Sequence, residues 1–181
     1  MPLPLRFPWR RLPQAGLAAL LLAAPLGAAA ASEGAGAGTG THAHGAPLPH
    51  ATDLAAHAAA AAARKEPLVV LVTLPGCQYC ETVRRHYLAP LAAEAGIAAR
   101  EVDMTAVTPL RAFETSQTTP RDWARQQGVR VAPTVLFLGP DGRTLAPPLV
   151  GLQPDFYGAY LDQALAQARE RLAQLPAGSR R

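Results

Sequence analysis

Both cysteines of the chain, Cys77 and Cys80, are separated by two residues and follow a strongly apolar run. The run, Leu68 to Leu74, is rich in valine, and its length and β-branching predict a strand buried on both faces. Pro75-Gly76 interrupts the strand, and a helix is expected to start at Cys77. The two thiols are therefore predicted to lie at a strand-to-helix junction, one helical turn apart.

Four functions of a C-x-x-C pair can be compared with the rest of the sequence. Haem attachment requires a histidine directly after the second cysteine, where this chain has Glu81. A structural zinc site needs four ligands, whereas the chain offers two cysteines and scattered histidines such as His86. A purely structural disulfide would close too short a loop to constrain the unfolded chain. A redox-active pair is favoured, with zinc or copper binding and a structural disulfide as the alternatives.

The predicted position gives the two thiols different roles. Unpaired backbone N–H groups and the helix dipole favour a thiolate at a helix N-terminus, so Cys77 is the expected attacking nucleophile. Cys80 lies three residues later on the same helical face, within reach of the first sulfur. It is therefore the expected resolving thiol, which breaks the mixed disulfide with substrate.

Hydrophobic periodicity and turn signals predict the remaining elements. Thr52 and Asp53 are the expected N-cap of an alanine-rich helix that stops before Pro67. The helix from Cys77 is expected to end at Gly96. Next come a strand over Ile97 to Asp103 and a short helix around Leu110 to Glu114. A helix over 120–127 is expected to be capped by Thr119 and ended by Gly128, and strands should follow over Val135 to Leu138 and Thr144 to Val150. The last element is a helix over Pro154 to Leu175, whose expected apolar stripe consists of Phe156, Tyr160, Leu161, Leu165 and Leu172. This order predicts an α/β fold with a mixed sheet between helices.

The N-terminal segment, residues 1–31, has the pattern of a cleavable signal peptide. Arg6, Arg10 and Arg11 form a positive region, Gly16 to Leu26 is apolar, and Ala29 to Ala31 offers a cleavage site. An uncleaved N-terminal membrane anchor is the alternative. Either places the rest of the chain outside the cytoplasm, in the periplasm, because the arginines stay inside.

Composition divides the remainder into a linker, one domain and a short tail. Residues 32–51 are rich in Gly and Ala and read as a flexible linker, in which His42, His44 and His50 could loosely hold a metal ion. A domain is expected over 52–175 and a disordered tail over 176–181.

Residues 1–31 carry three of the 17 basic residues and none of the 13 acidic ones, so without them the net charge falls from +4 to +1. No basic run with interleaved aromatics remains, which excludes nucleic-acid binding.

Three motifs together resemble the thioredoxin superfamily. They are the C-x-x-C after a strand, the V-A-P-T at 131–134 before an apolar strand, and the P-D-G turn at 140–142. The resemblance covers Asp53 to Gln174. With Tyr79 before the second cysteine, the chain is similar to the periplasmic thioredoxin-related group, which includes thioredoxins associated with sulfur oxidation and cytochrome maturation. It implies a thioredoxin fold with a central mixed four-stranded sheet flanked by helices, and no cofactor.

The resemblance also implies a substrate-binding surface. In the family the position of Pro133 is a cis proline beside the C-x-x-C, and the residue before it, here Ala132, offers backbone hydrogen bonds to substrate. Gln78 and Tyr79, between the cysteines, are expected to contact substrate as well.

Two positions depart from the common family pattern. Gly76 replaces a tryptophan, and Leu71 replaces an aspartate that accepts the proton of the resolving thiol. Another group must therefore accept that proton here, and water is favoured over Glu81.

These observations predict an exported, monomeric thiol:disulfide oxidoreductase without metal. It would reduce disulfides of substrate proteins through Cys77 and Cys80 and take electrons from a membrane thiol donor. A reductase is favoured because the domain lacks the large helical insertion of dedicated oxidases, and because the similar group consists mostly of reductases. The alternative is a metal-handling or peptide-binding chaperone of the same fold without redox turnover.

Overall fold

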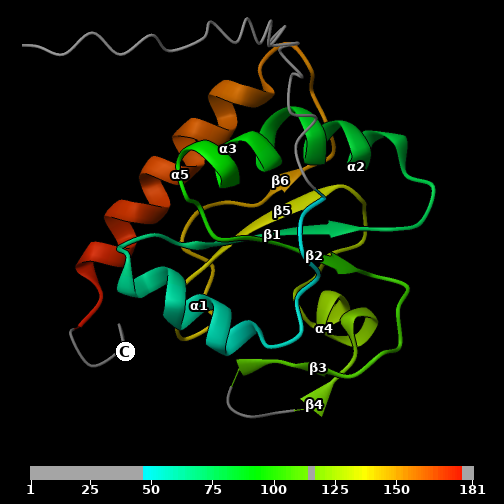
Figure 1. The fold of residues 1–181 in the computed structure, drawn as a ribbon, viewed down its shortest axis with the longest axis horizontal. Coiled ribbons are helices and arrows are strands. Elements are labelled where there is room, and N and C mark those ends of the chain that lie inside the picture. The colour runs from blue at the N-terminus through cyan, green and yellow to red at the C-terminus, as the bar shows by residue number, and fades with distance from the viewer. Residues whose placement is uncertain (1–46, 114–116, 177–181) are drawn as a thin grey trace, which may run out of the picture. The chain divides into compact units, whose positions relative to one another are not determined.

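A four-stranded sheet forms the centre of the molecule, with helices on both faces (Figure 1). The computed structural model describes residues 47–113 and 117–176. Its strand order is β2–β1–β5–β6, with one parallel and two antiparallel pairings. The predicted α/β class and mixed four-stranded sheet are confirmed. The segments predicted as signal peptide, most of the linker and nearly all of the tail lie outside the described residues.

The central strand is β1, Leu68–Thr73, and all six of its residues are buried, as its apolar sequence predicted. It pairs in parallel with β2, Ala99–Asp103. On its other side it runs antiparallel to β5, Thr134–Leu138, which in turn pairs with the short edge strand β6, Leu149–Val150. The register places Leu71 beside Glu101 and Thr73 beside Asp103. Because side chains alternate along a strand, both of these pairs lie on the same face of the sheet.

Each face of the sheet has its own hydrophobic core. Helices α1, Leu54–Ala63, and α4, Pro120–Gln126, contribute Leu54 and Trp123 to the first core. Helices α2, Gln78–Val83, α3, Ala89–Glu94, and α5, Tyr157–Gln174, cover the second core, to which Val83 and Leu161 belong. The sheet thus separates the helix that follows the cysteine pair from α1 and α4.

Side-chain caps start two of the predicted helices where the sequence placed them. Asp53 accepts a hydrogen bond from the N–H of Ala56 at 2.8 Å, at the start of α1. Thr119 accepts one from the N–H of Asp122 at 3.1 Å, with Pro120 as the first residue of α4. Each cap satisfies an N–H group that has no partner inside the helix.

The helix predicted from Cys77 is present, but a π-helical turn, η1 (Arg84–Leu88), divides it into α2 and α3. In this turn the N–H of Ala89 bonds to the carbonyl of Arg84, five residues earlier. Pro90 follows directly. A proline ring collides with the carbonyl four residues before it in a regular α-helix, and the wider turn relieves that collision. Gly96, with a φ of 65°, follows the end of the helix as predicted.

The short helix predicted around Leu110 to Glu114 is wrong for its first residues, and among the described residues of that range only Phe113 has helical geometry, of the 3₁₀ type. Its first two residues form β3, Leu110–Arg111, which pairs antiparallel with β4, Gln117–Thr118, while Glu114 lies outside the described residues. The N–H of Arg111 also donates to the carbonyl of Thr52, at 3.0 Å. This bond to a distant segment holds the backbone extended, and local propensity does not register such a contact.

Two predictions near the C-terminus are corrected in detail. The strand expected over Thr144 to Val150 is reduced to β6 with a single bridge at Thr144, because prolines 147 and 148 have no N–H to donate to a ladder. Phe156 and Tyr160 were expected on the buried stripe of the last helix, yet they are 62% and 43% exposed. The buried stripe starts instead at Tyr157 and continues through Leu161, Ala164, Leu165, Ala168 and Leu172.

The chain before α1 runs along the outer edge of β2. The N–H of Ala51 donates to the carbonyl of Glu101 at 2.8 Å, and the N–H of Glu101 donates to the carbonyl of Pro49 at 3.0 Å. Leu48 is 4% exposed and belongs to the second core. This segment therefore covers the backbone edge of β2. In the part of the chain that the structure describes, no helix combines the length and apolar character needed to cross a membrane.

Candidate redox site

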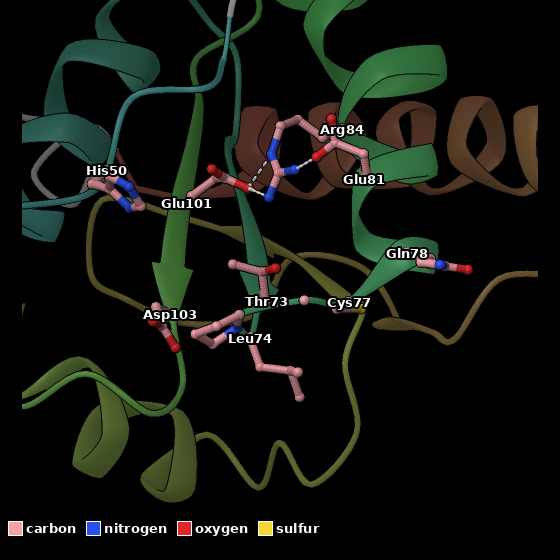
Figure 2. Close-up of a pocket in the computed structure, with 11 residues that line it drawn as sticks. His50, Thr73, Leu74, Cys77, Gln78, Glu81, Arg84, Glu101 and Asp103 are labelled. Carbon is pink, nitrogen blue, oxygen red and sulfur yellow. Dashed lines mark hydrogen bonds and ion pairs between the residues drawn. The ribbon is translucent and has the colours of Figure 1, made fainter.

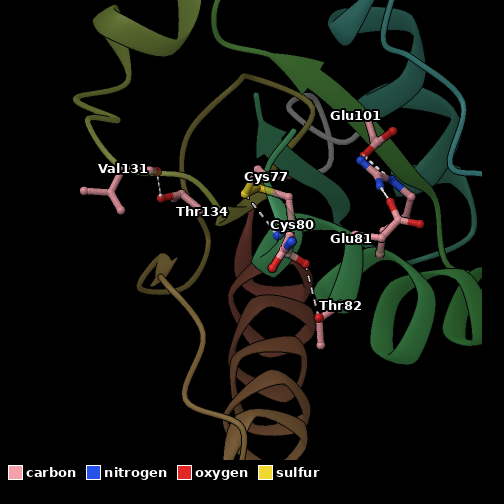
Figure 3. Close-up of a disulfide and its surroundings, with 9 residues drawn as sticks. Cys77, Cys80, Glu81, Thr82, Glu101, Val131 and Thr134 are labelled. Atoms are coloured by element: carbon pink, nitrogen blue, oxygen red, sulfur yellow. Dashed lines mark hydrogen bonds and ion pairs between the residues drawn. A yellow bond between two sulfur atoms is a disulfide. The ribbon is translucent and has the colours of Figure 1, made fainter. Parts of the chain in front are cut away.

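The cysteine pair lies where β1 gives way to α2, as predicted, and Figure 2 shows Cys77 at this junction. Gly76 adopts a φ of 73°, a conformation that residues with a Cβ rarely tolerate, and so permits the tight turn after Pro75. Cys77 is the N-cap of α2, and Cys80 lies inside its first turn. In this structure the two form a disulfide, with their Cα atoms 5.2 Å apart (Figure 3).

The two sulfur atoms have different surroundings. Cys80 is 0% exposed and belongs to the core, whereas Cys77 is only partly buried. The Cys77 sulfur accepts a hydrogen bond from the backbone N–H of Cys80 at 3.1 Å. A backbone donor at a helix N-terminus stabilises negative charge on sulfur, which favours the thiolate of Cys77 once the disulfide is reduced. Cys77 is thus the sulfur that an incoming disulfide can reach.

The residues predicted to bind substrate lie on two segments near this sulfur. Gln78 and Tyr79 are both exposed, and Tyr79 is 66% exposed. On the other segment, the Ala132–Pro133 peptide bond is cis, Ala132 is partly buried and Pro133 is buried. Figure 3 shows the neighbours of this bond, Val131 and Thr134, in the surroundings of the disulfide.

A hydrogen bond holds the loop before β5 in shape. The hydroxyl of Thr134 donates to the carbonyl of Val131 at 2.7 Å, across Ala132 and Pro133. The carbonyl of Pro133 accepts from the N–H of Gly151 at 2.8 Å, which ties the loop to the residue after β6. Val131 itself is 50% exposed, so the loop presents apolar surface to solvent.

Leu71 provides no proton acceptor, because its side chain is a hydrocarbon, and it is fully buried in the second core. The carboxylate nearest in register is Glu101, on the adjacent strand, which sequence reasoning missed. Glu101 is 4% exposed, and its Oε1 lies 2.6 Å from the guanidinium of Arg84. Arg84 also forms an ion pair with Glu81, which in turn contacts Arg85. Glu81 is therefore held by two arginines.

Glu81, Arg84 and Glu101 line a pocket of about 450 Å³ that opens beside Cys77 (Figure 2). Thr73, Glu101 and Asp103 form its wall on the sheet, and His50 lies at the end of the preceding segment. The other linker histidines, at 42 and 44, lie outside the described residues. Across residues 47–113 and 117–176 no group of three or more His, Cys, Asp or Glu side chains is suited to hold a metal ion.

The signals for this pocket were present in the sequence but ambiguous. Glu101 is a charge at an inward position of the predicted strand Ile97 to Asp103, and Arg84 stands one helical turn after Cys80. Either residue alone is typical of a solvated surface. The parallel pairing of β1 with β2 brings them together, and that pairing depends on the whole fold.

Comparisons with solved structures return proteins of low identity. Thioredoxin f from spinach chloroplast is 17% identical, with 70% of this chain and 97% of that chain covered and a TM-score of 0.48. Mitochondrial thioredoxin 3 from Saccharomyces cerevisiae, in its oxidised form, is 18% identical, covers 66% and 93%, and has a TM-score of 0.44. A thioredoxin-fold protein from Helicobacter pylori is 15% identical, covers 61% and 84%, and has a TM-score of 0.42. Likenesses of this degree carry no argument about function.

The assignment rests on the sequence of the domain. A comparison with curated proteins found no significant match. A family model described as a thioredoxin-like domain matches residues 54–168, more than half of the chain. The fold and the close cysteine pair within that match support a thiol–disulfide oxidoreductase. The chain belongs to the family of thioredoxin-like domains.

Proposed function

We propose that the chain reduces disulfides of substrate proteins outside the cytoplasm, through a dithiol formed by Cys77 and Cys80. The observation that carries this proposal is the unequal exposure of the two sulfurs: Cys77 is accessible at a helix N-terminus, and Cys80 is fully buried behind it. A pair that served only as a structural link would not require one sulfur to be open to solvent.

The proposed reaction has two exchange steps. The Cys77 thiolate attacks one sulfur of the substrate disulfide, forms a mixed disulfide with it and releases the other substrate sulfur as a thiolate. Cys80 then loses its proton and attacks the Cys77 sulfur. This forms the Cys77–Cys80 disulfide seen here and releases the second substrate thiolate, which takes up a proton. Two electrons pass from the dithiol to the substrate disulfide.

The reducing direction is supported by the size of the domain. Between β2 and β5 the described residues contain only the small β3–β4 pair and α4, so a large helical insertion of the kind found in dedicated oxidases is not seen there. The similarity to the periplasmic thioredoxin-related group, which consists mostly of reductases, supports the same direction. A membrane thiol donor would return the disulfide to the dithiol, and the chain would act as a monomer.

The reduction potential, measured by equilibration with glutathione, tests this direction. We expect a value closer to the about −270 mV of thioredoxin than to the about −120 mV of a strong periplasmic oxidant. Reduction of insulin by the dithiol form should accompany it. A potential near −120 mV, with rapid oxidation of reduced substrate proteins, would assign the chain to oxidation instead.

Export is proposed from the N-terminal residues, in which three arginines precede the apolar run Gly16 to Leu26. N-terminal sequencing of the mature protein, purified from a periplasmic fraction, should begin close after Ala31. Recovery of the uncleaved chain from the cytoplasm would contradict this proposal without affecting the redox chemistry.

A further inference from the structure

The pocket beside Cys77 has an excess of negative charge. Its lining includes the carboxylates of Glu81, Glu101 and Asp103 and one guanidinium, that of Arg84, while Arg85, outside the lining, pairs with Glu81, so one carboxylate is in excess. Arg84 is already engaged by the first two of these carboxylates. Asp103 is the carboxylate of the lining that forms no ion pair with the described residues. The pocket is therefore unsuited to an anion and favourable to a cation.

Asp103 is held through one of its oxygens, and the described residues offer no partner to the other. Its Oδ1 accepts hydrogen bonds from the backbone N–H and the hydroxyl of Thr105, at 2.8 and 2.7 Å. These bonds fix the orientation of the carboxylate at the end of β2. Figure 2 shows Asp103 on the side of the pocket opposite Arg84, below Glu101.

A second, independent observation comes from Thr73 at the end of β1. Its residue is 5% exposed, and its Oγ1 is buried without a hydrogen-bond partner in the described part of the chain. The same residue lines the pocket and is the register partner of Asp103. Buried hydroxyl groups are nearly always hydrogen-bonded, so this hydroxyl, on a residue that lines the pocket, can serve as the partner of a donor bound there.

We propose that this pocket binds a lysine or arginine side chain of the substrate, close in sequence to the cysteine that Cys77 attacks. The inference rests on the proposed function. The ammonium or guanidinium group would pair with Asp103 and donate a hydrogen bond to the hydroxyl of Thr73, while the deeper Glu101 adds to the negative field. A metal ion fits less well, because the described residues contain no group of three or more suitable donors.

Matched peptide substrates test this inference. Three short peptides, each with the same disulfide, carry Arg, Gln or Glu beside the reactive cysteine, and the oxidation of the Cys77–Cys80 dithiol by each is followed. We expect kcat/KM to fall in the order Arg, Gln, Glu, with about a fivefold ratio between the first and last, which corresponds to one partly exposed ion pair. The ratio should shrink with added salt, since the Debye length falls from about 10 Å at 0.1 M to about 3 Å at 1 M.

Three variants locate the effect. Asp103→Asn keeps the Oδ1 acceptor for Thr105 but removes the charge, so the Arg-to-Glu ratio should fall toward one. Thr73→Val keeps the side-chain shape and should slow turnover of the Arg peptide more than that of the Glu peptide. Asp162→Asn, on the exposed face of α5, is the matched control and should leave the ratio unchanged.

The outcomes separate this inference from the proposed function. Turnover of all three peptides at equal rates, or a ratio that survives Asp103→Asn, would overturn the cation pocket and leave the reductase intact. Absence of turnover with every peptide, while the dithiol is fully reduced, would overturn the proposed reductase and this inference with it.

Discussion

Cys77 and Cys80 differ in solvent access and in the groups that contact their sulfurs. The Cys77 sulfur accepts the N–H of Cys80 at the start of α2, whereas Cys80 is fully buried. The same contrast decides reactivity, because the thiolate is the reactive form and the reagent must reach it. The chemistry of the site is thus divided between two residues one helical turn apart.

Alkylation of the reduced protein tests this difference. We expect iodoacetamide near neutral pH to modify Cys77 at least tenfold faster than Cys80, because only the first sulfur is both accessible and stabilised as a thiolate. Peptide mapping of briefly treated protein measures the two rates, and the unfolded protein, in which both should react alike, is the control. Equal rates in the folded protein would contradict the assignment of Cys77 as nucleophile.

Single substitutions separate the two roles. In Cys80→Ser the mixed disulfide cannot be resolved, so covalent complexes with disulfide-containing substrates should accumulate through Cys77. Cys77→Ser should trap almost none, because its remaining thiol is buried. Non-reducing electrophoresis after incubation with oxidised insulin shows the difference. Equal trapping by the two variants would mean that the order of attack is wrong.

Sequence alone predicted the position of the cysteine pair but not the charges beside it. Spacing and a strand-to-helix boundary are local signals, so the sequence predicted both the position of Cys77 and Cys80 and their chemistry. Glu101 and Arg84 are 17 residues apart and meet only through the pairing of β2 with β1. The sequence showed Glu81 as a carboxylate next to Cys80, but it did not predict the ion pairs of Glu81 with Arg84 and Arg85.

At the scale of elements, the Arg84–Glu101 ion pair joins η1 to β2. The side chains are 18% and 5% exposed, so both charges are largely withdrawn from water. Removing one partner of such a pair leaves the other charge buried and uncompensated. The pair thus secures the helix that carries the cysteines against the sheet.

We expect Arg84→Met to lower the free energy of unfolding by about 3 kcal/mol, because it strands the Glu101 carboxylate. The double variant Arg84→Met/Glu101→Leu should recover most of that loss, since it removes both charges and leaves apolar side chains. Urea denaturation of the two variants and the native protein measures the difference. A double variant no more stable than the single one would show that the loss comes from packing rather than from charge.

Helix α1 contains a histidine that should make stability depend on pH. Burial and, secondarily, the charge of Arg100 lower the pKa of His57, against a smaller opposing effect of Asp53, and its Nε2 is buried without a partner among the described residues. The unfolded chain takes up a proton near the ordinary pKa of 6.5, while the folded protein takes it up only at lower pH. The stability contributed by neutral His57 is therefore complete above the ordinary pKa of 6.5 and declines as the pH falls below that value.

The melting temperature should accordingly fall between about pH 7 and pH 5, and His57→Gln should flatten part of that slope. The control is His86→Gln, which removes a histidine at an exposed position on η1. A slope that is identical in His57→Gln and the native protein would show that other groups account for it.

The elements that were predicted correctly are determined by residues close together in the sequence, whereas the elements that were missed depend on contacts between distant residues. Caps at Asp53 and Thr119 and the apolar run of β1 are visible within a few residues. The β3–β4 pair depends on a bond between Arg111 and Thr52, which are far apart in sequence. Phe156 was misplaced because the buried stripe of α5 is fixed by a contact with a distant helix. Tyr157, and not Phe156, packs against Tyr87, with the ring centroids 4.8 Å apart.

At the scale of the whole molecule, the fold depends on a segment that composition alone assigned to the linker. Residues 47–51 run beside β2 and contribute Leu48 to the second core. They also cover an edge of the sheet that would otherwise expose unpaired backbone groups, and such edges promote aggregation. Composition could not reveal this role, because one leucine between prolines has no periodicity to recognise.

This arrangement predicts where the chain can be shortened. A chain beginning at residue 52 should be less stable than one beginning at residue 47 by about 2–3 kcal/mol, the value of burying one leucine side chain fully. Leu48→Ala in the longer chain should lower the free energy of unfolding by a similar amount. This variant keeps the backbone bonds of Pro49 and Ala51 to β2, so it measures the contribution of the side chain alone. The shorter chain should in addition aggregate more readily, because only it uncovers the backbone of β2. Urea denaturation and light scattering measure the two effects, and equal stability of both chains would place the start of the folded domain after Ala51.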